Sequence, residues 1–93
     1  MSVLDGEIIK RGYKTNLSGT RYVREAVRII LDRPGPQRIQ MTKELYPTIA
    51  KAANVDWRCV ERSMRFAVKD AQPGRTVSQE VYDLAAVVRA YED

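Results

Sequence analysis

The sequence predicts an all-α protein, a compact bundle of about five helices that contains a helix-turn-helix. Three observations favour this class: apolar residues recur at three- and four-residue spacing, polar residues that can cap helices precede these stretches, and residues 42–71 form two such stretches joined by a tight turn. A chain of 93 residues, 44% hydrophobic and 30% charged, is typical of one folded domain. We therefore expect a single domain over residues 1–93, with the motif at about 42–71 and a C-terminal packing helix at about 78–91.

The first helix is predicted over residues 3–11, ending before Gly12, with Leu4 and Ile8 on its apolar face. The connector that follows, residues 13–17, continues a basic stretch. We interpret that charge as belonging to a solvated linker, with a phosphate contact as the alternative.

The second helix is opened by Ser18 or Thr20 and runs to about Asp32. Its predicted buried face comprises Tyr22 or Val23, Ala26, Val27 and Ile30. Its opposite face alternates in sign at four-residue steps, which is typical of a solvent face with intrahelical ion pairs: Arg21, Glu25, Arg28 and Asp32. The run Pro34-Gly35-Pro36 ends the helix, and a single turn is expected over residues 37–41.

The next segment is predicted to form two helices, over residues 43–53 and 57–71, joined by a turn of three or four residues. Asn54 tolerates the left-handed backbone that a sharp corner between helices needs. Asp56 can cap the following helix by accepting a bond from a free backbone N–H. Two helices joined in this way are typical of a helix-turn-helix, whose second helix enters the DNA major groove.

The first helix of this motif is expected to begin with Thr42 as its cap. Pro47 would then be its fifth residue, and the lost hydrogen bond predicts a slight bend. We assign phosphate contacts to polar or basic residues on this helix and near the end of the next one: Thr42, Lys43, Lys51 and Lys69.

The second helix of the motif carries two stripes on opposite sides. The apolar stripe comprises Val60, Met64, Ala67 and Ala71, and the basic stripe comprises Arg58, Arg62, Arg65 and Lys69 with Glu61 at its edge. Such a helix can pack on a core while its basic stripe faces phosphates and base edges. A solvated surface helix is the alternative, and the adjacent turn favours DNA binding.

Two residues near the start of that helix allow more than one interpretation. We interpret Trp57, the only tryptophan, as covering the corner of the motif, with a contact to a sugar or a thymine methyl group as the alternative. Cys59, the only cysteine, is interpreted as a bystander on the flank of the helix and not as a redox switch.

Several runs resemble one known family. They are Thr42-Lys43-Glu44-Leu45-Tyr46-Pro47, Ile49-Ala50-Lys51, Val60-Glu61-Arg62 with Arg65, and, upstream, Gly19 with Tyr22, Arg24, Glu25 and Ala26. Over about residues 7–71 the chain resembles the C-terminal DNA-binding (effector) domain of the stage-zero sporulation initiation response regulator of Firmicutes. The resemblance implies an all-helical domain that binds short promoter boxes in double-stranded DNA and regulates transcription.

The resemblance also implies that Glu61, Arg62 and Arg65 contact bases. The chemistry agrees, because Arg can pair with guanine O6 and N7 and Glu can accept a hydrogen bond from the cytosine amino group. The family has an Arg where this chain has Cys59 and a small residue where it has Arg58. We therefore add Arg58 to the base-reading set and expect a shifted base preference.

The last helix is opened by Ser78, or by Thr76 with Gln79 as a capping box. Its predicted apolar face comprises Val81, Leu84, Ala85, Val88 and Tyr91. We expect it to pack on the motif within the monomer, with a dimer surface on DNA as the alternative. In the family, a longer stretch before this helix is associated with contacting the RNA polymerase sigma subunit. This chain largely lacks that stretch, so the sequence leaves a sigma contact open.

Composition excludes several classes of function. The absence of histidine and the single cysteine exclude a Ser-His-Asp arrangement and a typical zinc site, so we expect no enzyme, no metal and no other cofactor. No apolar stretch approaches the roughly 20 residues of a membrane span, and no signal peptide is evident. One cysteine allows no internal disulfide, which favours the cytoplasm.

Two functions are left. A net charge of +4 favours an anionic partner, in line with sequence-specific binding of double-stranded DNA. The alternative is a helical protein–protein interaction module that keeps the helix-turn-helix as a scaffold. Since the 93 residues contain no receiver domain, we expect either an excised effector domain or a small stand-alone relative.

Overall fold

A computed structural model describes residues 2–33 and 39–92 as five α-helices and one π-helical turn. In chain order they are α1 (Val3–Lys10), α2 (Ser18–Asp32), η1 (Met41–Leu45), α3 (Tyr46–Ala53), α4 (Trp57–Ala71) and α5 (Val77–Glu92). These described ranges contain no strand, which confirms the predicted all-α class. Pro34-Gly35-Pro36 and the first residues of the turn predicted over 37–41 lie outside them.

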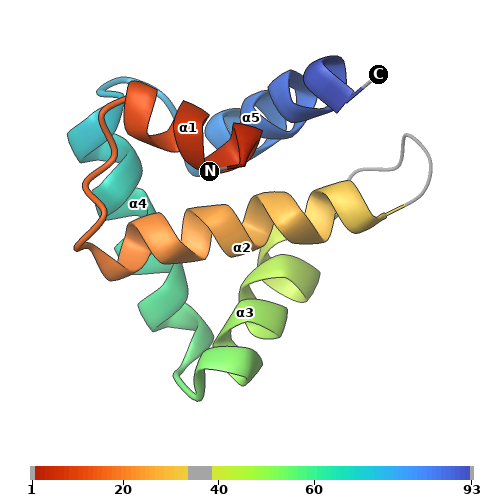
Figure 1. Cartoon of the computed structure of the whole chain (residues 1–93). Coiled ribbons are helices and arrows are strands. Elements are labelled where there is room, and N and C mark those ends of the chain that lie inside the picture. The colour runs from red at the N-terminus through yellow and green to blue at the C-terminus, as the bar shows by residue number, and fades with distance from the viewer. Residues whose placement is uncertain (1, 34–38, 93) are drawn as a thin grey trace.

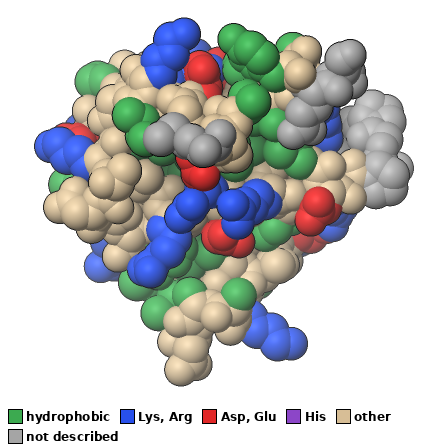
Figure 2. Space-filling model, viewed as in Figure 1, with side chains coloured by type: hydrophobic (Ala, Val, Ile, Leu, Met, Phe, Trp, Pro, Cys, Tyr) green, Lys and Arg blue, Asp and Glu red, His purple; other side chains and the backbone are tan. Residues whose placement is uncertain are grey.

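Helix α2 is the central element (Figure 1). Helices α1 and α5 lie on one side of it and α3 on the other, while α4 crosses it near its N-terminal end and makes its most extensive contact. All residues predicted for its buried face are buried: Tyr22, Val23, Ala26, Val27 and Ile30. On its outer face basic and acidic side chains alternate (Figure 2), and Nη1 of Arg28 lies 3.5 Å from Oε1 of Glu25.

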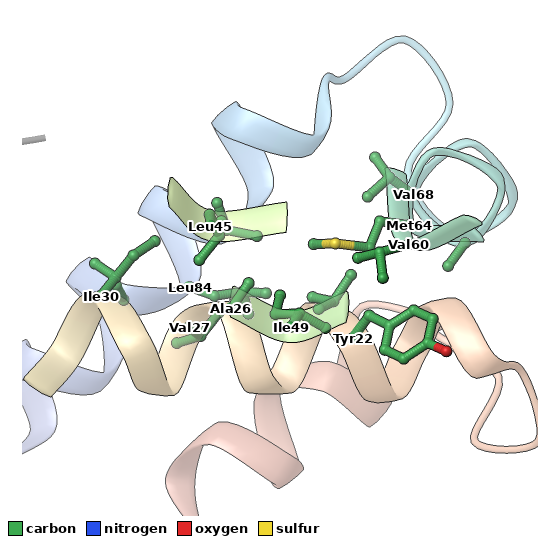
Figure 3. Packing of buried hydrophobic residues seen from close by; sticks show 14 of the residues in the cluster. Tyr22, Ala26, Val27, Ile30, Leu45, Ile49, Val60, Met64, Val68 and Leu84 are labelled. Carbon is green, nitrogen blue, oxygen red and sulfur yellow. The ribbon is translucent and has the colours of Figure 1, made fainter. Parts of the chain in front are cut away.

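One hydrophobic core joins α2 to the four elements that follow it. Figure 3 shows side chains of η1, α3, α4 and α5 directed toward the buried face of α2. Leu45 of η1, Met64 of α4 and Leu84 of α5 are fully buried there. Burial of apolar surface contributes about 25 cal/mol per Å². Helix α4 is therefore stabilised largely by its burial against α2, whereas α3 packs mainly on α4 and η1.

The backbones of α2 and α4 meet at Gly19. A Cβ atom at this position would lie 1.9 Å from the carbonyl oxygen of Ser63 and 2.8 Å from Cβ of Ala67. Real side chains cannot approach a backbone carbonyl so closely, so only glycine fits the contact. Gly19 therefore fixes how near α4 lies to the N-terminal end of α2.

The beginnings of the first two helices differ in their capping. Ser2 caps α1, its Oγ accepting a 3.1 Å hydrogen bond from the backbone N–H of Asp5. Helix α2 begins at Ser18, one of the two predicted starts, but its N-cap residue is Leu17 and no side chain caps it. The predicted start of α1 is thus correct, whereas the predicted polar cap of α2 is wrong, because Ser18 is the first residue of the helix and not its cap.

The predicted cap at Thr42 is wrong, because the N-cap residue is Gln40 and the helical turn begins at Met41, two residues before the predicted start. The turn η1 is π-helical, so the backbone N–H of Tyr46 bonds to the carbonyl of Met41, five residues back. Pro47 follows directly. The irregularity expected at this proline therefore takes the form of a widened turn on its N-terminal side.

Helix α5 begins with the capping box that was one of two predicted starts. The backbone N–H of Thr76 donates to Oε1 of Gln79 at 2.8 Å, and the N–H of Gln79 donates to Oγ1 of Thr76 at 3.1 Å. The helix packs mainly on α2 and α1 and less on the motif. Placing Tyr91 on the buried face was wrong, since this side chain is 71% exposed.

A buried carboxylate lies at the junction of α1, α5 and the loop before α5. Glu80 has no exposed surface, and its Oε2 lies 3.2 Å from Nη1 of Arg11 and 2.6 Å from Nε of Arg75. Arg11 also lies 3.2 Å from Glu7 and 3.3 Å from Asp83. Two guanidinium groups thus compensate the charge that burial would otherwise make costly.

Candidate nucleic-acid interface

The turn between α3 and α4 has the predicted geometry. Asn54 adopts the left-handed conformation, with φ 58° and ψ 46°, and the N–H of Val55 donates to the carbonyl of Ala50 at 3.0 Å. Oδ1 of Asp56 accepts a 2.8 Å hydrogen bond from the N–H of Arg58 and so caps α4. The sequence therefore determines both the corner and the first turn of the second helix of the motif.

Helix α4 spans the predicted residues and presents two distinct faces. Its buried residues are Val60, Met64, Ala67 and Val68, with Ala71 half-buried. Its exposed face carries the four predicted basic residues: Arg58, Arg62, Arg65 and Lys69. The guanidinium groups are therefore directed away from the core, as base or phosphate contacts require.

Two of these arginines have neighbours on the same helix. Nη1 of Arg65 lies 3.2 Å from Oε1 of Glu61, and the Arg65 side chain stays 66% exposed. The Arg58 guanidinium lies over the Trp57 ring, 5.7 Å from its centroid. Arg62 has no ion pair within the described part of the chain. The contacts of Arg58 and Arg65 are with exposed or half-buried neighbours on the same helix, so all three guanidinium groups are accessible to a nucleic acid.

Trp57 does not belong to the hydrophobic core. It is 36% exposed at the first turn of α4 and lies outside the buried cluster. The interpretation that Trp57 covers the corner as part of the core was therefore wrong. The exposed ring instead supports the Arg58 guanidinium from below. Cys59, one residue further along, is a free and exposed thiol.

The other predicted phosphate contacts lie on η1 and α3. Thr42 and Lys43 are exposed on η1, and Lys51 is exposed in the last turn of α3. The structure thus places Arg58, Arg62, Arg65 and Lys69 together on one helix face, and Thr42, Lys43 and Lys51 on the two elements before it.

A groove of about 510 Å³ extends along one side of the basic face. Its lining includes Glu61, Arg65 and Lys69 from α4, together with Arg75 from the α4–α5 loop and the Tyr46 ring. Burial, followed by the charge of Glu61, raises the pKa of Tyr46, so its hydroxyl stays neutral in the groove wall. Arg75 pairs with Glu80 and Asp83, so the exposed basic surface of this groove belongs chiefly to α4.

Sequence reasoning missed two features. Phe66 is 61% exposed on α4, beside the basic face, and no role was assigned to it. Glu80 was not recognised as a buried residue, although it precedes Leu84 and Val88 by four and eight residues on the apolar stripe of α5. That spacing was the available signal for Glu80.

The chain matches a known protein-family model. The model described as "Sporulation initiation factor Spo0A C terminal" matches residues 6–89, which is most of the chain. Within the described residues, no helix combines the length and apolar character needed to cross a bilayer.

Proposed function

Because this chain belongs to the family of the Spo0A C-terminal domain, a sporulation response-regulator effector domain, we propose that it binds double-stranded DNA sequence-specifically and regulates transcription. In this proposal α4 is the recognition helix and enters the major groove. The turn η1 and helix α3 lie across the DNA backbone. A cytoplasmic location belongs to the same proposal.

The exposed arginine row on α4 is the observation that carries this proposal. Arg58, Arg62 and Arg65 lie on one exposed face, while the opposite face of the same helix is buried against α2. A rigidly held helix loses little conformational freedom on binding, so its side chains can be positioned for base contacts. The tight turn at Asn54 also fixes the orientation of α4 relative to α3, as in a helix-turn-helix, and a simple solvated surface helix does not require such a turn.

We assign the roles within this surface by side-chain chemistry. Arg62, Arg65 and Arg58 would donate hydrogen bonds to guanine O6 and N7, and Glu61 would accept one from a cytosine amino group. Since Glu61 and Arg65 form an ion pair, we expect them to contact neighbouring bases as a unit. Thr42, Lys43, Lys51 and Lys69 would contact phosphates, which position the protein without selecting sequence.

The protein-interaction alternative depends on the last helix. The apolar residues of α5 are already buried in the monomer: Val81, Leu84, Ala85 and Val88. That leaves this helix without a continuous apolar face for a partner or a second copy. The connector between α4 and α5 spans only Gln72 to Thr76, so a sigma contact like that of the family would need another surface.

Binding of random-sequence duplex DNA at low and moderate salt tests the proposal. We expect binding at low salt that weakens steeply as salt rises, because phosphate contacts release counterions. Site selection from a random duplex library should then yield a preferred sequence. Absence of binding at low salt would contradict the proposal and favour the interaction module.

A further inference from the structure

Phe66 is an exposed aromatic residue beside the arginine row of α4. Its side chain is 61% exposed and lies outside the hydrophobic core. It follows Arg62 by four residues, so at about 100° per residue the two side chains lie roughly 40° apart around the helix. Phe66 is therefore a neighbour of the basic face and not of the apolar stripe.

Among the described residues, Phe66 belongs neither to the hydrophobic core nor to the side chains packed against it. The buried stripe of α4 is complete without it, and the residues one turn away on its own face are Arg62, Ser63, Lys69 and Asp70. An exposed apolar side chain is common on protein surfaces and needs no explanation by itself. Its place within a surface that would face base edges is what suggests a role.

We propose that Phe66 is a further specificity-determining residue, which selects a thymine by contacting the C5-methyl group of that base. This inference rests on the proposed function. The thymine methyl is the apolar group that a base pair presents in the major groove, and cytosine lacks it. A phenyl ring has no donor or acceptor, so it discriminates through this methyl contact and not through hydrogen bonds.

The position of Phe66 predicts where this thymine lies. Because Phe66 is one turn beyond Arg62 on an adjacent line of the helix surface, the thymine should lie within one or two base pairs of the guanine contacted by Arg62. Arg62 and Lys69, one turn before and after Phe66, would hold this part of α4 against the DNA. The phenyl ring would then contact the floor or the wall of the major groove.

Replacement of thymine by deoxyuridine, which lacks only the methyl group, tests the proposal. A selected site is scanned one thymine at a time with the full chain and with Phe66→Ala. We expect one thymine at which deoxyuridine weakens binding of the parent about fourfold, the equivalent of one desolvated methyl group. At that thymine Phe66→Ala should bind both DNAs equally, whereas Phe66→Leu should retain part of the preference.

The matched control is Ile9→Ala, which removes an exposed apolar side chain from α1. This variant should keep the full deoxyuridine effect. If the parent binds no DNA, the proposed function fails. If the parent binds a selected site but Phe66→Ala remains as sensitive as the parent at every thymine, only this inference fails. It is also overturned if Phe66→Ala changes self-association in sedimentation and leaves the thymine preference unchanged.

Discussion

The hydroxyl group of Tyr13 donates a 2.7 Å hydrogen bond to Oε1 of Glu80, across 67 positions of the chain. Arg11 and Arg75 donate hydrogen bonds to Oε2, so both carboxylate oxygens of Glu80 have partners although the residue has no exposed surface. In addition, Nε2 of Gln72 donates to the carbonyl of Arg11 at 2.8 Å. The end of the proposed recognition helix is thereby tied to α1 and α5.

Alkaline pH should weaken the fold through Tyr13. Burial, and then its hydrogen bond to Glu80, raise the pKa of Tyr13 above the ordinary value of about 10. The unfolded chain therefore loses this proton at a lower pH than the native chain. The resulting stabilisation is complete below pH about 10 and declines as pH rises above it.

Urea unfolding of the parent and Tyr13→Phe between neutral pH and about pH 11 measures this effect. At neutral pH the variant should be less stable, by about 1–3 kcal/mol, because Glu80 loses a buried hydrogen bond. The difference should shrink above pH about 10. A difference that stays constant across this range would contradict the assignment.

Gly19→Ala should strongly destabilise the protein. The new Cβ would lie 1.9 Å from the Ser63 carbonyl oxygen, so α2 and α4 would have to separate. Overpacking of this kind costs about 1–3 kcal/mol and occasionally more. Thermal unfolding should show the loss, while Gly6→Ala, at a half-buried position in α1, should be neutral or stabilising. Similar unfolding temperatures for both variants would contradict the close helix contact.

The corner of the motif should tolerate glycine but not alanine. Asn54 has a φ of 58°, a conformation that costs most side chains about 1–2 kcal/mol. We expect Asn54→Gly to keep the free energy of unfolding within a few tenths of a kcal/mol and Asn54→Ala to lower it by about 1 kcal/mol. Chemical denaturation measures both. Equal stability of the two variants would mean that the left-handed turn is not strained.

Removing single arginines from the exposed face of α4 should weaken and broaden DNA recognition. Arg62→Ala or Arg65→Ala should cost about 1–3 kcal/mol on a selected site and reduce discrimination between bases. Because Arg28 is also exposed but lies on the outer face of α2, Arg28→Ala serves as the control and should leave affinity unchanged. Unchanged affinity of the α4 variants would remove these residues from the base-reading set.

The lysines should act through phosphates alone. Replacing Lys43, Lys51 or Lys69 by alanine should lower binding about equally for all sequences and reduce the salt slope by about one unit. Lys10→Ala, at the end of α1, is the control and should keep the parent slope. A substitution that leaves the slope unchanged identifies a lysine that contacts no phosphate.

The predicted part of the fold depended on local signals. Asn54, Asp56 and the two stripes of α4 lie close together in the sequence, so turn chemistry and periodicity predicted that helix with its bounds. The start of α5 was predicted in the same way, from a capping box contained within four residues.

The features that sequence reasoning did not predict depend on tertiary contacts. Glu80 receives its partners from Arg11, Tyr13 and Arg75, and no local pattern predicts that these will converge. Tyr91 continues the apolar spacing of α5 but is 71% exposed and lies outside the hydrophobic cluster formed by the described residues. Arg89 already bonds to the Ile30 carbonyl in the last turn of α2, and the helix extends beyond it.

The shared core also determines whether the helix-turn-helix can fold when it is separated from the rest of this protein. Leu45 and Met64 are buried in the same core as Leu84. An isolated peptide of residues 42–71 would therefore expose its apolar face to solvent and would not fold stably. The exposed side chains of α4 do not take part in this core packing. We therefore expect that substitutions of those side chains alone can change the preferred DNA sequence while the rest of the protein stays unchanged.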